Sequence, residues 1–454
     1  MRLSTPPVKS RASTLRTMPG VLLAIAYTAF FLYLMRRTPF FARVPGLGMR
    51  TIGAIFVLKI IAGTALWAVY TYAYPDRGTA DIFKFFDDSK VLYDALWTAP
   101  GDFMRMLTGV ANDSPYFDEQ YYGVMNNWVR KYENNVYNDS HTMIRFNAVL
   151  RLFSFGEYHV HTVFACLVST TGLVALYRAV HPLLVNFERG LMPAIFLWPS
   201  VLFWSSGVLK ESLLVFGLGV LLLGFIGAWP DRLAWRPVVA IITGLALMLV
   251  VKFYVLMCLI PGLLSWWWAR ARPGRPLLQS LVVHALALFA VLISGSLVPG
   301  YGVLELLAIK QRDFIGMATG VDSGSLILLP TLEPDIFSFL RNAPHALYMS
   351  FFSPFEVLDT GPLAWMGAAE NVLLLLIPII ALRYARPWPS IDKASLLFLL
   401  SFVLLLSLLI GWTVPVVGAL VRYRVPILPF VAFISLIVID PHRAPRWVPF
   451  INRS

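Results

Sequence analysis

The chain has 454 residues, of which 58% are hydrophobic and only 14% are charged, and its formal net charge is +12. A soluble domain averages roughly 25% charged residues, so this composition excludes an ordinary water-soluble fold. The positive charge does not indicate a nucleic-acid partner, because no basic domain stands apart from the apolar segments. Cys166 and Cys258 both lie in apolar runs, and they imply neither a disulfide framework nor a metal framework.

Long apolar runs, taken in chain order, predict about ten or eleven transmembrane helices. A helix that crosses a bilayer needs about 20 apolar residues, and many windows of this chain meet or approach that length. The expected fold class is therefore an all-α, polytopic membrane protein, in which residues 1–454 form a single integral-membrane domain. The candidate spans are 18–35, 51–74, 158–178, 191–206, 208–229, 237–251, 254–269, 277–297, 361–382, 394–412 and 425–440.

The charged residues between these runs divide into two groups. Most short connections carry arginine and lysine, which the positive-inside rule assigns to the cytoplasm. Two longer segments, 75–157 and 299–360, hold 19 of the 25 acidic residues. We expect both to be periplasmic loops of a protein of the bacterial inner membrane. The basic tail 1–17 then falls on the periplasmic side, against the rule, which leaves open whether segment 18–35 crosses fully.

The two long loops contain segments with helical periodicity. In the first loop, residues 81–97 have apolar side chains at helical spacing and predict an amphipathic helix lying on the membrane surface. A second helix is expected over 141–153, with Asp139 or Ser140 as its cap. The second loop is also partly amphipathic, and we expect its prolines to break it into short pieces.

Three aspartates at the start of the first amphipathic helix are the candidate catalytic residues. Asp81 and Asp88 are seven residues apart and share one helical face, while Asp87 lies one residue's rotation away. A carboxylate beside a membrane-embedded cavity can act as a general base. The competing interpretation is a solvated polar face on which Lys84 pairs with Asp81.

Cations occupy three tight connections on the same predicted face as the acidic loops. A charge at this depth is costly and usually has a partner, and arginines are natural ligands of phosphate oxygens. The competing interpretations are a snorkelling pair at 210–211 and salt bridges from the arginines to acids of the loops. The predicted substrate-binding residues are Lys210, Glu211, Lys252, Arg422 and Arg424, together with Tyr93 of the amphipathic helix.

The order of these motifs resembles the GT-C superfamily of integral-membrane glycosyltransferases. The resemblance rests on ADIFKFFDDSKVLYDAL in the first loop, PSVLFWSSGVLKESLL at a tight turn, and RYRVPILPF before the last span. Two departures from the family pattern are a second span before the acidic loop and a glutamate at position 211, where aspartate is common.

The resemblance implies a donor sugar on a polyprenyl phosphate or diphosphate, and a glycan, lipid or protein as acceptor. Asp81 or Asp88 would deprotonate the acceptor hydroxyl, and the cations would stabilise charge on the leaving phosphate. Mg²⁺ or Mn²⁺ held by the aspartates would suit carboxylate ligands, although the sequence does not require a metal. The partners would be membrane lipids and the lipid-linked sugar, with no nucleic acid.

Three other functions stay open at the level of sequence, and one of them is a non-catalytic scaffold for a surface-polymer machine, which predicts no deep cavity beneath the loops. An O-antigen-type polysaccharide polymerase or ligase would use similar substrates but depend on Arg312, Arg341 or His345 of the second loop. A transporter of lipid-linked sugars would place ionisable residues inside spans, for which Glu370 and His284 are candidates. The chain has no P-loop, so ATP-driven transport by this chain alone is not supported.

Overall fold

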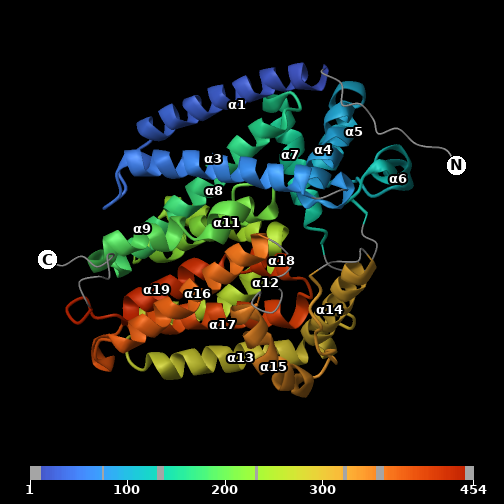
Figure 1. Cartoon of the computed structure of the whole chain (residues 1–454). Helices are drawn as coiled ribbons and strands as arrows, with labels where there is room; N and C mark the ends of the chain where they lie inside the picture. The colour runs from blue at the N-terminus through green and yellow to red at the C-terminus, as the bar shows by residue number, and fades with distance from the viewer. Residues whose placement is uncertain are drawn as a thin grey trace.

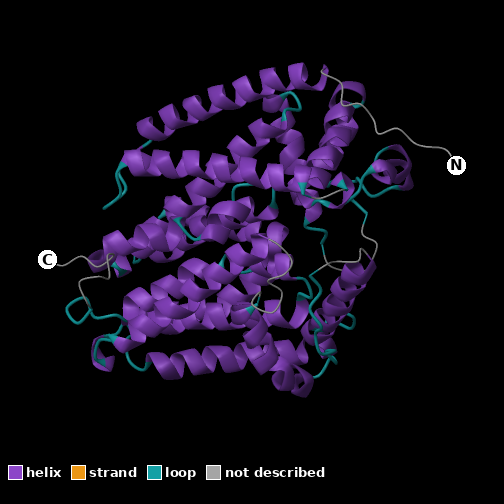
Figure 2. Cartoon of the chain, viewed as in Figure 1, coloured by secondary structure: helices purple, strands orange, loops and turns teal. Residues whose placement is uncertain are grey.

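The computed structural model describes residues 12–73, 76–129, 137–230, 234–320, 325–353 and 362–444. These residues form helices joined by turns, and their only β-structure is a few isolated bridges (Figure 2). The predicted all-α fold class is therefore confirmed. In Figure 1 most of the long helices run side by side, and α4, α5, α6 and α14 gather at one end of this bundle.

Eight of the described helices are long and apolar enough to cross a membrane. A ninth candidate span consists of α18 (Val417–Tyr423) and α19 (Ile427–Val438), which meet at a bend of 53°. The chain is thus a multi-pass membrane protein, as its apolar runs predict. The eight helices are α1 (Ala12–Arg37), α3 (Met49–Tyr72), α8 (Tyr158–Val180), α11 (Lys210–Leu222) with the π-helical turn η5 (Leu223–Gly227), α12 (Trp235–Ala271), α13 (Pro276–Leu297), α16 (Pro362–Arg383) and α17 (Lys393–Thr413).

Helix α12 folds back on itself and accounts for two of the predicted spans. The backbone of Lys252 is non-helical, with φ −152° and ψ 77°. Gly224 packs against the Pro237 carbonyl of the first arm, and the Phe225 ring lies 6.2 Å from the Trp266 ring of the second arm. A straight helix would place residues 237 and 266 about 43 Å apart. Because both arms reach neighbouring residues of η5, the chain reverses at Lys252.

The segment predicted as a span over 191–206 is not one continuous helix. Helix α9 (Glu188–Phe196) ends before Leu197, and α10 (Pro199–Trp204) is only six residues long. The proline at position 199 has no backbone N–H and disfavours helical geometry in the residue before it. Trp198 accordingly has extended backbone angles, φ −61° and ψ 126°.

Helix α10 ends inside the bundle. Ser205 and Ser206, which follow it, contact Lys59 of α3 and Cys166 of α8, respectively. Lys59 and Cys166 both lie in the middle third of their helices, so the turn 205–209 lies at membrane depth. Irregular backbone is tolerated there only where protein or a water-filled cavity surrounds it. Helices α8 and α11 run parallel, because Ser206 lies level with Thr162, Phe216 with Gly172, and Gly227 with Ala179, so the α9–α10 segment returns the chain through the bundle.

The first predicted loop forms a helical layer at one end of the bundle. The expected amphipathic helix is α4 (Asp81–Thr98), and the expected second helix is α7 (Ser140–Ser154). The apolar face of α4 is covered by protein instead of lipid, because the Phe86 ring lies 4.9 Å from His161 and 5.2 Å from Tyr158 of α8. We call the end that α4–α7 and α14 form the loop end. Shorter helices are α2 (Pro39–Ala42), η1 (Arg77–Thr79), α5 (Pro100–Thr108), α6 (Pro115–Gln120), η2 (Tyr122–Val124), η3 (His181–Leu183), η4 (Val185–Phe187) and η7 (Trp388–Ser390).

The second predicted loop contains two long helices, α14 (Val303–Gly320) and α15 (Ile336–Phe352). Pro344 does not break α15, contrary to the expectation that prolines divide this loop into short pieces. Helix α15 packs closely on α17, where Ser350 donates a hydrogen bond to the carbonyl of Ser407. This packing compensates for the backbone hydrogen bond that a proline removes.

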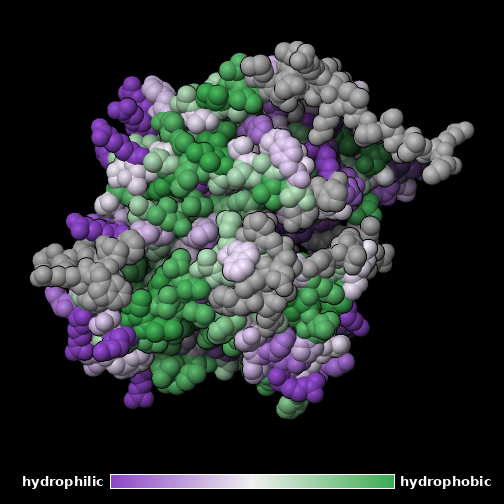
Figure 3. Space-filling view, viewed as in Figure 1, coloured by the Kyte–Doolittle hydropathy of each residue, from purple (hydrophilic) through white to green (hydrophobic). Residues whose placement is uncertain are grey.

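The outer surface of the bundle is apolar. Figure 3 shows hydrophobic side chains over the middle of the visible face and hydrophilic ones gathered at its left margin. Helix α13 is the clearest case, because only 6% of its apolar window is buried inside the protein. A helix that is apolar on nearly every exposed side is suited to lipid tails.

Candidate functional site

A chain of ion pairs joins four elements at the loop end of the bundle. Arg422 of α18 donates from Nη1 to Oδ2 of Asp81 at 2.8 Å, and its Nε lies 2.9 Å from Oε1 of Glu211. The same oxygen of Glu211 accepts a hydrogen bond from Nζ of Lys252 at 2.7 Å. Residues from α4, α11, the tip of α12 and α18 therefore meet through one guanidinium group and one buried carboxylate.

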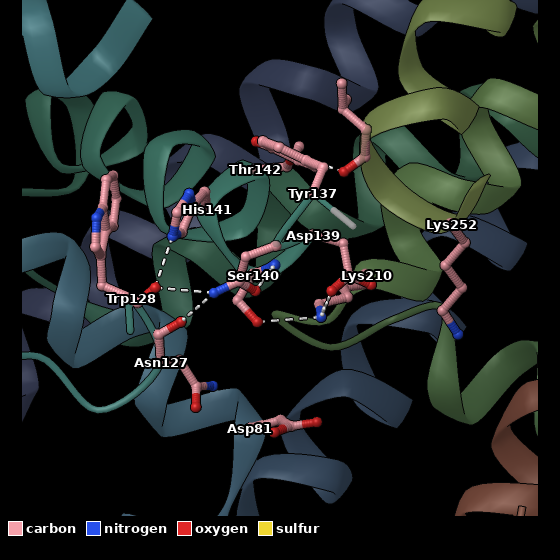
Figure 4. Close-up of polar contacts among 12 residues, drawn as sticks. Asp81, Asn127, Trp128, Tyr137, Asp139, Ser140, His141, Thr142, Lys210 and Lys252 are labelled. Carbon is pink, nitrogen blue, oxygen red and sulfur yellow. Dashed lines mark hydrogen bonds and ion pairs between the residues drawn. The ribbon is translucent and has the colours of Figure 1, made fainter. Parts of the chain in front are cut away.

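A second ion pair lies beside this chain. Nζ of Lys210 lies 2.8 Å from Oδ1 of Asp139 and 3.2 Å from Oγ of Ser140, and Figure 4 shows Asp81 and Lys252 nearby. Asp139 makes no capping bond to α7, so one of the two predicted caps binds Lys210 instead. We call Asp81, Asp139, Lys210, Glu211, Lys252 and Arg422 the ion-pair network. Its three carboxylates balance its three cations.

Local structure explains why these side chains converge. Glu211 lies in the first turn of α11, where the helix dipole favours an acid. Lys252 occupies the reversal of α12, and Arg422 lies in the last turn of α18 just before the 53° bend. The predicted snorkelling pair is not formed, because Lys210 and Glu211 bind different partners.

Exposure increases along the network from Glu211 to Asp81. The Glu211 side chain is fully buried and that of Arg422 is 12% exposed, whereas 41% of the Asp81 side chain can be reached by solvent. Burying charges costs several kcal/mol for each ion unless partners compensate. Glu211 meets this requirement with two cations, and Asp81 forms the solvent-accessible edge of the network.

The electrostatic environment keeps Asp81 ionised. Burial by itself would raise the pKa of this carboxyl, but Arg422 and, to a lesser degree, Lys210 outweigh burial and hold the pKa below its ordinary value. Asp81 is therefore a hydrogen-bond acceptor at neutral pH. Its basicity depends on whether Arg422 remains beside it, because an opposite charge favours the ionised form.

Aromatic rings lie along one side of the network. Nζ of Lys252 lies 4.1 Å from the centre of the Tyr423 ring, which is 6.1 Å from the Tyr254 ring. Lys210 lies 5.3 Å from the ring of Phe85 on α4. Cation–π contacts of this kind stabilise ammonium groups where water is scarce. They hold the two lysines in place without neutralising their charge.

Two of the three candidate aspartates lie outside the network. Both carboxylate oxygens of Asp88 accept backbone N–H bonds of 2.8 Å, from Asn126 and Asn127, and the side chain is almost fully buried. Burial raises the pKa of Asp88 more than these two bonds lower it. Asp87 pairs with Arg77, and both side chains are exposed. A shared helical face therefore did not bring Asp81 and Asp88 to one site.

Arg424 and Tyr93 are also separate from the network. Arg424 is buried, and its Nη1 donates to the carbonyls of Ser350 and Ser353 at the C-terminal end of α15, at 2.9 and 3.2 Å. Its charge interacts with that of Glu370. Tyr93 lies farther along α4, where its ring is 6.0 Å from that of Trp97.

Two buried charges position the site: Lys59, which the sequence interpretation missed, and Glu370, which it considered only for the transporter alternative. Nζ of Lys59 donates to Oγ of Ser205 at 2.6 Å just after α10, and Glu370 accepts a 2.7 Å bond from the Ser200 N–H at its start. An acid at the N-terminus and a cation at the C-terminus both suit the helix dipole. Together they fix α10 and the turn that leads to Glu211. The signal for Lys59 was an ionisable residue inside an apolar run.

The three candidate aspartates do not come together as a metal site. Among the described residues, no group of three or more histidine, cysteine, aspartate or glutamate side chains could hold a metal ion. Asp81, Asp87 and Asp88 each bind a different partner, and Asp81 is already neutralised by a guanidinium. Mg²⁺ or Mn²⁺ bound by these three carboxylates is therefore inconsistent with the geometry.

No protein-family model, curated protein or solved structure matches this chain. What the site can bind is therefore inferred from the side chains of the ion-pair network. Arg422, Lys210 and Lys252 offer hydrogen-bond donors to an anion, and Asp81 offers an acceptor at the solvent-accessible edge. An anion that binds Nη1 of Arg422 must compete with Asp81 for that group.

Proposed function

We propose that the chain is a glycosyltransferase of the GT-C type. In this proposal it transfers a sugar from a polyprenyl phosphate or diphosphate to an acceptor, on the periplasmic face of the bacterial inner membrane. The single observation that carries the proposal is the 2.8 Å contact between Arg422 and Asp81. It joins a side chain suited to phosphate with a carboxylate that an acceptor hydroxyl can reach.

The network supports binding of a lipid-borne phosphate. A polyprenyl phosphate carries its charge at headgroup depth, while its lipid remains in the bilayer. Nε of Arg422 faces Glu211, and Nη1 faces Asp81. A phosphate oxygen would therefore bind Nη1 and displace the Asp81 carboxylate. Lys210 is within reach of the same region, since its charge acts on Asp81. Guanidinium–phosphate contacts are strong and directional.

In this scheme, binding of the donor makes Asp81 a stronger base. When a phosphate draws Arg422 away, Asp81 loses its main neutralising charge and becomes more basic. Asp81 takes the proton of the acceptor hydroxyl as the acceptor oxygen bonds to the anomeric carbon of the sugar. The bond between that carbon and the phosphate oxygen breaks, and its electron pair leaves with the polyprenyl phosphate. Arg422, Lys210 and Lys252 stabilise the leaving charge.

A transfer assay tests the role of Asp81. The full chain in phospholipid nanodiscs is given undecaprenyl phosphate carrying a panel of radiolabelled sugars, with membrane glycolipid extract as acceptor, and release of the undecaprenyl phosphate is measured. Asp81→Asn should lower the rate by about 100-fold or more, since general base catalysis contributes that much. Asp94→Asn is the matched control, because Asp94 lies on the same helix and pairs with the exposed Lys90. Full activity of Asp81→Asn would exclude this reaction scheme.

A polysaccharide polymerase or ligase is the second candidate, and one observation favours it. Arg312, on which that function would depend, lines a cavity between α13 and α14 that shares no residue with the ion-pair network. Under this alternative, Arg312→Gln abolishes polymer formation and Asp81→Asn preserves it. The opposite pattern supports the glycosyltransferase.

A further inference from the structure

A cavity of about 550 Å³ lies between the C-terminal end of α13, helix α14 and the turn 331–334. Helix α14 separates it from the ion-pair network. On one side of α14, Phe314 lies 6.4 Å from the Tyr423 ring of the network region. On the other side, Ala308 and Arg312 line the cavity. The volume lies within the range of ordinary small-molecule pockets.

Three charged side chains line this cavity, and none of them forms an ion pair with another described residue. They are Glu305, Arg312 and Glu333. Glu305 and Arg312 are seven residues apart on α14, so they lie on the same face of the helix. All three residues are solvent-exposed, and one cation and two carboxylates along one cavity are suited to a ligand that carries both a negative and a positive group.

The α13 side of the cavity includes apolar side chains and continues into the lipid-facing surface. Val291 and Leu292 of α13 line the cavity. Helix α13 is the least buried of the candidate spans, and its neighbouring Leu288 and Phe289 are exposed. A ligand can therefore keep an acyl chain against α13 while its headgroup enters the cavity. Such a ligand reaches the site from the bilayer.

We propose that this cavity binds one zwitterionic aminophospholipid of the surrounding bilayer, with the chemistry of phosphatidylethanolamine. The lipid phosphate contacts Arg312, and the primary ammonium donates hydrogen bonds to Glu305 and Glu333. Phosphatidylglycerol lacks an ammonium group and leaves both carboxylates uncompensated, which selects against it. The quaternary ammonium of phosphatidylcholine has no N–H to donate. This site is independent of the proposed glycosyl transfer.

Native mass spectrometry tests the site with the full chain. The protein is released from nanodiscs of equal parts phosphatidylethanolamine, phosphatidylcholine and phosphatidylglycerol, and the retained lipids are identified. The unmodified protein should retain phosphatidylethanolamine. The double variant Glu305→Gln/Glu333→Gln should lower its retention about tenfold or more, as expected for losing hydrogen bonds to charged groups. Arg312→Gln should lower retention to a similar extent.

Exposed residues elsewhere at the loop end provide the controls. Glu119→Gln on α6 and Arg105→Gln on α5 remove equivalent charges away from the cavity and should leave retention unchanged. Ala308→Phe fills the cavity while keeping every charge, and it should also expel the lipid. Melting temperatures identify any variant that fails to fold, in which case the remaining variants decide.

Several outcomes would overturn the proposal. Equal retention of the three phospholipids by the unmodified protein would exclude an aminophospholipid site. Retention unchanged in the double glutamine variant would exclude Glu305 and Glu333 as the recognising groups. Displacement of phosphatidylethanolamine by added undecaprenyl phosphate would assign the cavity to a lipid-linked substrate instead. None of these measurements depends on transferase activity.

Discussion

Arg422 and Arg424 lie two residues apart at the bend between α18 and α19, yet they have opposite surroundings. Arg422 faces two carboxylates, Asp81 and Glu211, at the partly open end of the ion-pair network. Arg424 is almost fully buried and donates to two backbone carbonyls at the end of α15. The same residue type therefore has an exchangeable partner at one position and fixed partners at the other.

The difference shows that burial alone does not identify a functional arginine. A carboxylate side chain can rotate away when a phosphate arrives, but the carbonyls that end a helix cannot leave without unwinding it. Arg422 can therefore exchange partners, and Arg424 holds α15 against the bend. Among the described residues, Nε and Nη2 of Arg424 have no hydrogen-bond partner, which is costly for a buried charge. We assign a structural role to Arg424 because the partners of its Nη1 are backbone carbonyls at the end of α15.

The largest expected effect follows from removing the carboxylate that Arg422 and Lys252 share. Glu211→Ala leaves two cations buried without their common acid. Breaking a buried ion pair in this way lowers the free energy of unfolding by about 3–5 kcal/mol. Thermal unfolding in detergent, followed by intrinsic tryptophan fluorescence, measures the loss as a lower melting temperature.

A double variant distinguishes loss of charge balance from loss of packing. Glu211→Gln/Lys252→Met removes one acid and one cation, so it should recover much of the stability that Glu211→Gln alone loses. If the double variant is as unstable as the single one, the ion pair does not explain the effect. The contrast between the two arginines would then lose its electrostatic basis.

The second prediction addresses the two arginines directly. Arg422→Gln should weaken binding of fluorescent undecaprenyl phosphate about tenfold or more, because a charge-assisted hydrogen bond is lost. Arg424→Gln should leave this affinity within about twofold and lower the free energy of unfolding by about 1–3 kcal/mol, through the weakened bonds to α15. Microscale thermophoresis in nanodiscs measures affinity, and thermal unfolding measures stability.

The reverse result would contradict the assignment. If Arg424→Gln abolished binding while its melting temperature stayed unchanged, Arg424 would be the phosphate ligand. Arg422→Lys is a useful companion, because lysine keeps the charge but cannot contact Asp81 and Glu211 with separate edges of a planar group. It should bind more weakly than the unmodified chain and more strongly than Arg422→Gln.

The sequence predicted the class of the fold and much of the network, for identifiable reasons. Apolar length predicts membrane helices regardless of packing, and even the reversal at Lys252 followed from a charge between two apolar runs. The positive-inside rule does not explain cations on the membrane face that holds the acidic loops. For this reason Lys210, Lys252 and Arg422 were singled out. In the structure these cations converge with Asp81 and Glu211, and the Arg422–Asp81 contact is the salt bridge to a loop acid that the competing interpretation expects.

Other features depended on long-range contacts that periodicity does not encode. Asp88 has the same helical phase as Asp81, but its partners are backbone groups of Asn126 and Asn127, which no spacing rule identifies. Arg422 and Arg424 could not be distinguished, because the bend between α18 and α19 sets their directions. Asp139 was one of the two expected caps of α7, and its contact with Lys210 joins residues 71 positions apart in sequence.

The third prediction uses pH to separate the two aspartates of α4. The pKa of Asp81 is lowered in the folded chain, so its stabilising contribution is present above its ordinary pKa of about 4 and is lost as the pH falls through the folded value. The pKa of Asp88 is raised, so its contribution is present at low pH and is lost as the pH rises through the folded value. Because Asp81 is partly exposed, its effect should be about 1 kcal/mol or less.

Melting temperatures from neutral to acidic pH test these opposite slopes. The advantage of the unmodified chain over Asp81→Asn should shrink as the pH falls below about 4. Its advantage over Asp88→Asn should grow as the pH falls toward that value. Parallel curves for the two variants would mean that both aspartates have the same surroundings, in conflict with their different hydrogen bonds.

The smallest expected effect is that of Asp87, which the helical pattern placed among the candidate catalytic residues. Asp87 pairs with Arg77 on the surface, with both side chains about half exposed, and exposed pairs contribute about 0–1 kcal/mol. Arg77 also lies 3.9 Å from the centre of the Phe83 ring, so it keeps a contact when the carboxylate is lost. Asp87→Asn should leave the transfer rate within about twofold, and any stability loss should disappear at high salt because ions screen exposed charges. A large fall in rate with unchanged stability would move the base from Asp81 to Asp87, and Arg422 would then no longer touch the carboxylate that carries the reaction.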